Sequence, residues 1–157
     1  MPAALDGQVV SLHITSAGSQ EMSSPDSVTA VPGKGLEGDR YLLGTGFYSE
    51  KPDTGREITL IEEETLAALG TEQGIEFDGA ETRRNVVTRG VALNGLAGRE
   101  FMVGEVRLKG VRLCVPCQHL VEMTGKAVLK PLLERGGLRA DILSAGTIRV
   151  GDKVTSV

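Results

Sequence analysis

The sequence predicts a mainly β protein with short helices, folded as a barrel. Twenty-one of the 157 residues are glycine, about twice the usual share of roughly 7%, which indicates many tight turns and therefore many short strands. The apolar runs are short, and turn signals separate them about every eight to twelve residues, as in sandwiches and barrels. Because only 3% of the residues are aromatic and Trp is absent, the core must consist of Val, Leu, Ile and Ala.

Three strands and two loops are expected in the N-terminal part. Residues 9–14 alternate apolar and polar side chains and predict a first strand, and residues 28–31 and 57–61 predict two more. Residues 16–26 are small and polar, and residues 44–55 contain Gly and Pro. Both segments are therefore expected to be mobile loops.

A short helix is expected at residues 62–69, ending at Gly70. Its acidic first turn faces the positive end of the helix dipole, and glycine is a common helix stop. Residues 33–41 come before it and contain three glycines beside charged residues.

The C-terminal part predicts more strands. Residues 83–88 form a strand with basic residues at its entrance, and residues 93–98 form a turn. Residues 100–103 and 106–113 form a hairpin around the pair Gly104-Glu105.

A second short helix and the last strands complete the prediction. Residues 127–135 form a helix closed by glycines, and residues 138–143 and 147–150 form the last strands, followed by the Gly151-Asp152 turn. The two helices would act as plugs or lids of the barrel. No repeat or boundary interrupts the chain, so residues 1–157 are expected to be one domain with its core at about 8–154.

Composition and charge exclude several classes of protein. The net charge of −4 argues against a nucleic-acid partner, because such binding needs a basic face. No segment has the length and apolarity of a membrane span, and the first residues lack the order of a signal peptide. Two cysteines in a chain of this length are no secreted disulfide framework, so a reducing cytoplasm is the expected compartment.

The most informative segment is residues 111–119, Val-Arg-Leu-Cys-Val-Pro-Cys-Gln-His. It contains both cysteines, Cys114 and Cys117, and one of the only two histidines, His119. Pro116 places a turn between the two sulfurs. Thiols at the end of a strand, near a histidine and arginines, are where a thiolate can be stabilised to attack, carry sulfur or bind a soft metal.

Four interpretations of the two cysteines are open. A structural zinc site needs four ligands, and only His119 and the distant His13 could join the sulfurs. A thioredoxin-like redox pair requires the motif at the start of a helix, whereas a strand precedes it here. The sulfurs could also be two buried apolar groups, or Cys117 could be a single functional thiolate.

His119 could act on that thiolate as a general base or as a positive neighbour. It could equally be an exposed histidine or one with its hydrogen bonds satisfied inside the protein. His13 lies within a strand pattern and is interpreted as structural.

Two other segments could bind an anion. Arg83, Arg84 and Asn85 precede an apolar strand, and two guanidiniums with an amide suit a phosphate or a polar heterocycle. They could also be a solvated group near Glu81. A second segment places Lys34, Asp39 and Arg40 among glycines, whose backbone N–H groups can closely approach an anion.

Six segments occur in one order along the chain: Gly35-Leu-Glu-Gly-Asp-Arg40, Arg83-Arg-Asn-Val-Val-Thr-Arg-Gly90, Phe101-Met-Val-Gly-Glu-Val-Arg-Leu108, Leu113-Cys-Val-Pro-Cys117, Gly136-Gly-Leu-Arg-Ala140 and Gly146-Thr-Ile-Arg-Val-Gly-Asp152. As a set they resemble the MOSC family, the domain found at the C-terminus of molybdenum-cofactor sulfurases. The set also looks like the catalytic half of mitochondrial amidoxime-reducing components. The resemblance extends over nearly the whole chain.

The resemblance implies a β-barrel of the pyruvate-kinase type with a pocket for the molybdenum cofactor, molybdopterin. The family's cysteine falls on Cys117, which ligates molybdenum in cofactor-binding members and carries sulfur in sulfurase-type proposals. The family's Arg-x-Asn falls on Arg83 and Asn85 and would hold the pterin and its phosphate. The glycine-rich segment falls on Asp39 and Arg40.

Three functions are compatible with this resemblance. The chain could present Cys117 as a molybdenum ligand in a reductase of N-hydroxylated compounds, or in a subunit of one, with an external electron-donor protein. Gln118 and His119 stand where the amidoxime-reducing enzymes have other residues, and the chain lacks the N-terminal β-rich domain of those enzymes, so the resemblance supports the fold more strongly than the reductase activity. The chain could instead take a persulfide from a pyridoxal-phosphate-dependent cysteine desulfurase, without binding pyridoxal phosphate itself. It could also store or insert the cofactor without chemistry of its own.

Overall fold

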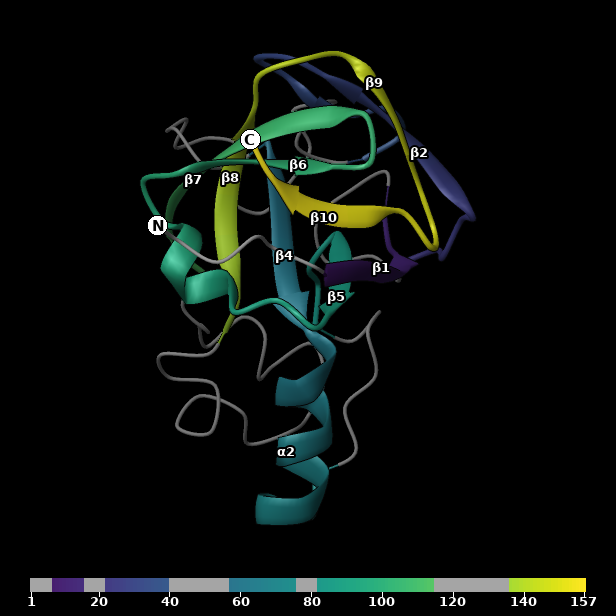
Figure 1. The fold of residues 1–157 in the computed structure, drawn as a ribbon. Coiled ribbons are helices and arrows are strands. Elements are labelled where there is room, and N and C mark those ends of the chain that lie inside the picture. Colours follow the sequence, from purple (N-terminus) through teal and green to yellow (C-terminus); the bar gives the residue numbers. More distant parts are fainter. Residues whose placement is uncertain (1–6, 16–21, 40–56, 76–81, 115–135) are drawn as a thin grey trace.

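The structure, a computed structural model, describes residues 7–15, 22–39, 57–75, 82–114 and 136–157 (Figure 1). The predicted loop at 44–55, the predicted helix at 127–135 and most of the predicted loop at 16–26 lie outside these ranges. In the described end of that last loop, Ser23 forms an isolated β-bridge with Ile14.

Seven strands form a closed barrel in the order β1-β10-β6-β7-β8-β4-β5, which confirms the predicted fold class. Only β4 and β5 run parallel to each other, and every other neighbouring pair in the barrel is antiparallel. In Figure 1, β10 lies between β1 and β6 and closes the barrel. The strands are β1 (Gly7–Leu12), β4 (Ile58–Glu62), β5 (Val86–Arg89), β6 (Glu100–Val103), β7 (Val106–Leu113), β8 (Leu138–Ile142) and β10 (Lys153–Ser156).

A second sheet of three antiparallel strands adjoins the barrel in the order β3-β2-β9. Its strands are β2 (Ser27–Val31), β3 (Gly35–Leu36) and β9 (Gly146–Arg149). β2 buries every second residue, as a strand does when one face covers a core. The Glu57 carboxylate connects sheet and barrel, because its Oε1 accepts the N–H of Gly33 at 2.9 Å and of Ile142 at 3.1 Å.

The core consists of aliphatic side chains, as the composition predicts. β7 shows how the sequence produces it, since Val106 and Leu108 are buried while Arg107 and Lys109 between them are exposed. Each fully buried aliphatic side chain contributes about 1.5–3 kcal/mol to folding. Phe101 is the one aromatic residue among the buried side chains of the described core.

The helix α2 (Glu63–Gln73) follows β4 directly and extends away from the barrel (Figure 1). Its base packs on the outside of β4 and β5 through a small cluster of Ile61, Leu69 and Val87. Within the described ranges, no helix is long and apolar enough to cross a membrane.

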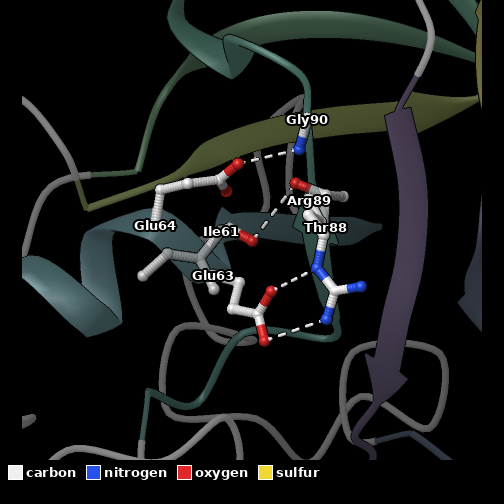
Figure 2. A network of polar contacts seen from close by, with 6 residues as sticks. All are labelled: Ile61, Glu63, Glu64, Thr88, Arg89 and Gly90. Carbon is white, nitrogen blue, oxygen red and sulfur yellow. Dashed lines mark hydrogen bonds and ion pairs between the residues drawn. The ribbon is translucent and has the colours of Figure 1, made fainter.

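Two acidic residues of the first helical turn fasten α2 to β5 (Figure 2). Glu63 accepts two hydrogen bonds from Arg89, at 2.6 Å from Nε and 3.3 Å from Nη2. Glu64 accepts the backbone N–H of Gly90 at 2.8 Å. Carboxylates at this end also interact favourably with the helix dipole, so the acidic turn both starts the helix and positions it.

The predicted end of this helix at Gly70 is wrong. The helix continues to Gln73, and Gly74 ends it with φ of 66°, its N–H bonded to the Gly70 carbonyl. Glycine inside a helix costs about 1 kcal/mol relative to alanine. Packing of Leu69 and Ile75 against the barrel helps to offset that cost, and Gly74 supplies the left-handed residue that ends many helices.

Strand predictions are confirmed for β2, β4, β6, β7, β8 and β9 with small shifts of their ends. The sequence predicts no strand after residue 150. This prediction is wrong, because β10 pairs with both β1 and β6. β10 has four residues, only one of them buried, Val154. A strand this short and polar gives little periodicity, and its partners supply most of what stabilises it. The predicted turn at residues 93–98 contains a 3-10 helix, η1 (Leu93–Leu96).

Candidate functional site

The segment predicted to carry the chemistry leaves the barrel at the end of β7. Cys117 and His119 lie outside the described residues, whereas Cys114 is described and its side chain is buried, with 1% exposed. The N–H of Cys114 donates to the carbonyl of Gly137 at 2.7 Å. The two chain ends on either side of residues 115–135 are therefore hydrogen-bonded to each other.

Arg84 reaches the same two chain ends from the entrance of β5. Its Nε donates to the carbonyl of Gly136 at 2.8 Å, and its Nη2 to the carbonyl of Cys114 at 3.4 Å. Nη1 donates to the carbonyl of Thr82 at 3.1 Å. The residue is 93% buried, so these carbonyl oxygens replace water around a buried positive charge.

Gly137 allows the close packing at this junction. Its φ of 109° is one that side-chain-bearing residues rarely adopt, and a Cβ there would lie 2.1 Å from the carbonyl oxygen of Leu60 in β4. Gly137, which the sequence predicts to close a helix, lets β8 lie against β4. The doubled glycine was the available signal for this close approach.

Arg83 differs from its neighbours in its backbone conformation. Its φ of 62° makes it the one described non-glycine residue with positive φ, a conformation that costs free energy and is enriched at functional sites. This residue interrupts the extended backbone, and β5 therefore begins at Val86 rather than at the predicted residue 83. The Arg83 side chain is half-buried.

Asn85 is fully buried and connects three parts of the barrel. Its Oδ1 accepts from the Thr59 backbone N–H at 3.0 Å and from the Thr59 hydroxyl at 3.2 Å. Its Nδ2 donates to the carbonyl of His13 at 3.1 Å. Within the described residues, the amide predicted to hold a pterin thus holds β4 and the end of β1 beside β5.

His13 is part of this structural network, as its position in a strand pattern indicates. Its ring nitrogens lie 2.8 Å from the hydroxyls of Ser11 and Ser24. Its backbone N–H donates to the carbonyl of Asn85 at 2.7 Å. Neither Ser24 nor Thr59 was expected to contribute, because hydroxyl residues give no spacing signal in a sequence.

The glycine-rich segment places two of its candidate residues, Lys34 and Asp39, in different surroundings. Asp39 is wholly buried, and its Oδ1 accepts the N–H of Thr15 at 3.3 Å. Lys34 is exposed in the turn between β2 and β3, where its N–H donates to the carbonyl of Val31. Arg40 lies outside the described residues. Asp39 is thus attached to the chain just after β1, at Thr15, which is two residues from His13.

Among the described acidic residues, Glu62 and Glu57 have a raised pKa. Burial raises the pKa of Glu62, and repulsion from Glu64 adds to this, while the N–H of Leu93 opposes it. Within the described ranges, no group of three or more His, Cys, Asp or Glu side chains could hold a metal ion. The predicted molybdenum ligand, Cys117, is not among these residues.

Comparison with known proteins identifies the family. Residues 38–155 match the model of the MOSC domain, and no curated protein matches the chain. The structure is similar to the YuaD protein of Bacillus subtilis, with a TM-score of 0.81 at 18% identity and all of both chains covered. It also resembles YiiM of Geobacillus stearothermophilus, with a TM-score of 0.73 at 15% identity, covering 96% of this chain and 75% of that one. YiiM of Escherichia coli gives 0.67 at 17% identity, with 99% and 70% covered. The family match extends over most of the sequence, and the chain belongs to the MOSC domain family.

Proposed function

We propose that this MOSC protein binds the molybdenum cofactor and presents Cys117 to it as a metal ligand. MOSC domains are associated with this cofactor in general. The observation that carries the proposal is the junction at the end of β7, where the two ends of the cysteine-bearing segment are hydrogen-bonded together and Arg84 contacts both. The bonds at this junction hold both ends of that segment at one place on the barrel.

The two cysteines differ in the way this function requires. The side chain of Cys114 is buried and its backbone groups are both hydrogen-bonded, which suits a packing role. Cys117 is three residues further on, so its Cα lies within about 11 Å of that of Cys114 by chain length alone. Cys117 follows Pro116 in the sequence, and a thiolate at this position would suit a soft metal.

The residues around the junction fit an anionic cofactor at Arg84. A guanidinium has five N–H groups, and three of those of Arg84 donate to neutral carbonyl oxygens. Two remain for a ligand, and a phosphate on molybdopterin would offset the buried positive charge. Arg83 is the second candidate for the phosphate. Asn85 fits less well, because both acceptor positions of its Oδ1 are used by Thr59.

When bound, the cofactor would supply molybdenum for reducing N-hydroxylated compounds with electrons from a separate donor protein. The residues of this chain would bind and orient it. Arg84 would hold the anionic group, and Cys117 would ligate the metal, which itself keeps the thiol deprotonated. No general base is then needed at Cys117.

Molybdenum and pterin analysis of protein purified from a cofactor-competent host tests the proposal. Wild-type protein and Cys114→Ser should both carry molybdenum, while Cys117→Ser should lose most of it. Cys114→Ser is the matched control because it removes the other sulfur of the same motif. Equal molybdenum in Cys117→Ser and wild type would exclude Cys117 as the ligand.

The same preparation would reveal a sulfur carrier. The purified protein could contain no molybdenum and gain a persulfide on Cys117 when mixed with a cysteine desulfurase. That result would contradict the molybdenum proposal and support a sulfur-carrier function instead. A carrier thiol must ionise without metal, and a neighbouring imidazolium lowers a thiol pKa. In that case, His119→Ala should slow sulfur loading near neutral pH and much less at high pH. Molybdenum binding would be nearly unaffected by this substitution.

A further inference from the structure

We propose that Ser24 is a nucleophilic serine activated by His13, in a surface site that takes the acyl group of small esters with a good leaving group. The site uses neither Cys117 nor Arg84 and needs no cofactor. It is carried by the two hydroxyl groups that lie at hydrogen-bond distance from the two ring nitrogens of His13.

Backbone pairing between the end of β1 and the chain before β2 brings Ser24 to His13. Ile14 and Ser23 form an antiparallel bridge and exchange backbone hydrogen bonds at 3.0 and 2.7 Å. In an antiparallel pair, the residue before one bridge partner lies opposite the residue after the other, so position 13 faces position 24. Nδ1 of His13 accordingly lies 2.8 Å from the Ser24 hydroxyl oxygen.

The other ring nitrogen contacts Ser11, two residues earlier in the chain. The hydroxyl oxygen of Ser11 lies 2.8 Å from Nε2. The backbone of His13 belongs to the Asn85 network, since its N–H donates to the Asn85 carbonyl at 2.7 Å and its carbonyl accepts from Nδ2 at 3.1 Å. The ring of His13 is therefore restrained both by its own backbone and by a hydroxyl on its far side.

Burial distinguishes the roles of the three side chains. His13 is 5% exposed, Ser11 is half-buried and Ser24 is exposed. An exposed hydroxyl is accessible to a substrate, while the hydrogen bonds of a buried base are stronger than they would be in water. A serine bonded to a histidine that a third group orients is the arrangement of an activated nucleophile. Ser24 is thus the nucleophile, His13 the general base and Ser11 a positioning residue.

The reaction uses the neutral ring with its proton on Nε2, so that Nδ1 accepts the Ser24 O–H. The Ser24 oxygen attacks the carbonyl carbon of the ester while its proton moves to Nδ1, and the backbone N–H of Ser24 can donate to the oxyanion. The bond to the leaving alcohol then breaks, and the alcohol takes the proton from His13. Water attacks the acyl group in turn and gives a proton to His13, which returns it to Ser24 as the carboxylic acid leaves.

The third group, Ser11, limits the class of substrate. A carboxylate in that place would stabilise the imidazolium through its charge, whereas a hydroxyl is neutral. Activation of Ser24 is therefore modest. It suits esters whose alcohol or phenol leaves readily, rather than amides.

The test is labelling of cofactor-free protein with an alkyl fluorophosphonate, whose phosphorus bonds to a nucleophilic serine oxygen and releases fluoride. Mass spectrometry of peptides gives the rate at each serine. In the wild type, Ser24 should be labelled about 100-fold faster than Ser27, an exposed serine at the start of β2, because a general base contributes at least this factor. His13→Gln should remove the difference, and Ser27→Ala should leave the rate at Ser24 unchanged.

Urea unfolding shows whether each variant is folded. A wild-type ratio of Ser24 to Ser27 below about ten-fold would overturn the proposal without any variant, as would a folded His13→Gln labelled as fast as the wild type. If His13→Gln is unfolded, Ser11→Ala decides, because it keeps the histidine. Labelling of Ser24 slowed by about five-fold, the factor for one net hydrogen bond, supports the proposal, and an unchanged rate opposes it.

The substrate class is tested separately with p-nitrophenyl acetate, an ester of an acidic phenol. An acetyl group on Ser24 after a brief reaction quenched with acid supports the ester class. Fluorophosphonate labelling of Ser24 without any acetylation there would overturn that class.

Discussion

At the scale of single residues, Asn85 shows how one buried side chain can hold a barrel together. It accepts two hydrogen bonds from Thr59 and donates one to His13, so it joins β4 and the end of β1 at the entrance of β5. Asn85→Ala would leave the N–H and hydroxyl of Thr59 and the carbonyl of His13 without this partner inside the protein. Buried groups left in this way cost about 1–3 kcal/mol each.

We expect Asn85→Ala to lower the free energy of unfolding by about 2–4 kcal/mol. The measurement is urea denaturation, with the midpoint compared at an unchanged slope. Glu37→Ala is the control, because Glu37 is exposed and its substitution should change stability by less than about 0.5 kcal/mol. Similar stability losses in both variants would show that the Asn85 network contributes little.

The sequence points to the entrance of β5 but not to the role of each residue there. The run Arg83-Arg84-Asn85 is conspicuous because three polar side chains precede an apolar strand. Which of them faces a ligand and which holds the backbone depends on Thr59, His13 and Gly136, which are distant in sequence. Side-chain partners of this kind cannot be predicted from spacing, because hydrogen bonding needs the folded chain.

At the scale of elements, η1 packs against the backbone of β7 at Gly110. A Cβ on Gly110 would lie 2.1 Å from the carbonyl oxygen of Leu96, whereas one on Gly95 would meet nothing within 4 Å. Gly110 also exchanges backbone hydrogen bonds with Gly98 and Arg99, at 2.8 and 2.9 Å. The glycine therefore serves close approach of two backbones rather than a turn.

Gly110→Ala should destabilise the protein by about 2 kcal/mol or more, because backbone must shift to admit the methyl group. Gly95→Ala should be neutral or slightly stabilising, since it reduces the freedom of the unfolded chain without a clash. Thermal unfolding of the two variants provides the comparison. Tolerance of Gly110→Ala would mean that η1 can move away from β7 at little cost.

The ion pair that fastens α2 to β5 has a pH dependence of known sign. Hydrogen bonds from Arg89 lower the pKa of Glu63 below its ordinary value. Its stabilising contribution is therefore present above the unfolded pKa of about 4.3 and is lost as the pH falls through the folded value. Both side chains are partly exposed, so the contribution is small and sensitive to salt.

Arg89→Ala should therefore lower the urea midpoint slightly at neutral pH and low salt. The difference from wild type should disappear well below pH about 4.3, where Glu63 is protonated in both states. High salt at neutral pH should also reduce it. A difference that persists unchanged at low pH would assign the effect to packing of the arginine stem instead.

At the scale of the whole molecule, Glu57 joins the three-stranded sheet to the barrel. Burial raises the pKa of its carboxyl, and the nearby Asp141 carboxylate adds to this, while the N–H groups of Ile142 and Gly33 oppose it. An acid with a raised folded pKa contributes stability that is complete below its unfolded pKa. That contribution is lost as the pH rises through the folded value.

Glu57→Gln should thus gain stability relative to wild type as the pH rises from about 4.3, the unfolded pKa, through the raised folded value. Its amide oxygen can still accept the two backbone N–H groups. Glu57→Ala should be less stable than wild type over the same range, because the N–H groups of Gly33 and Ile142 lose their acceptor. Urea unfolding across this range checks both, with exposed Glu37→Gln as control. Parallel curves for Glu57→Gln and wild type would contradict the assigned sign.

The sequence by itself determined the class of the fold, most of its strands and the family. Strand periodicity and turn residues are local, so a stretch such as β7 shows its buried side in its own alternation. The ordered MOSC segments are likewise visible without coordinates, and the match over residues 38–155 agrees with them.

Only the tertiary structure decided how the barrel closes and which residues join the chain at Cys114 to the chain at Gly136. The strand β10 is stabilised between β1 and β6, which come from distant parts of the chain. Arg84 meets Gly136 across 52 positions and Cys114 across 30. The free energy of such contacts arises from burial and hydrogen bonding between partners that the sequence does not place side by side, so local patterns cannot specify them.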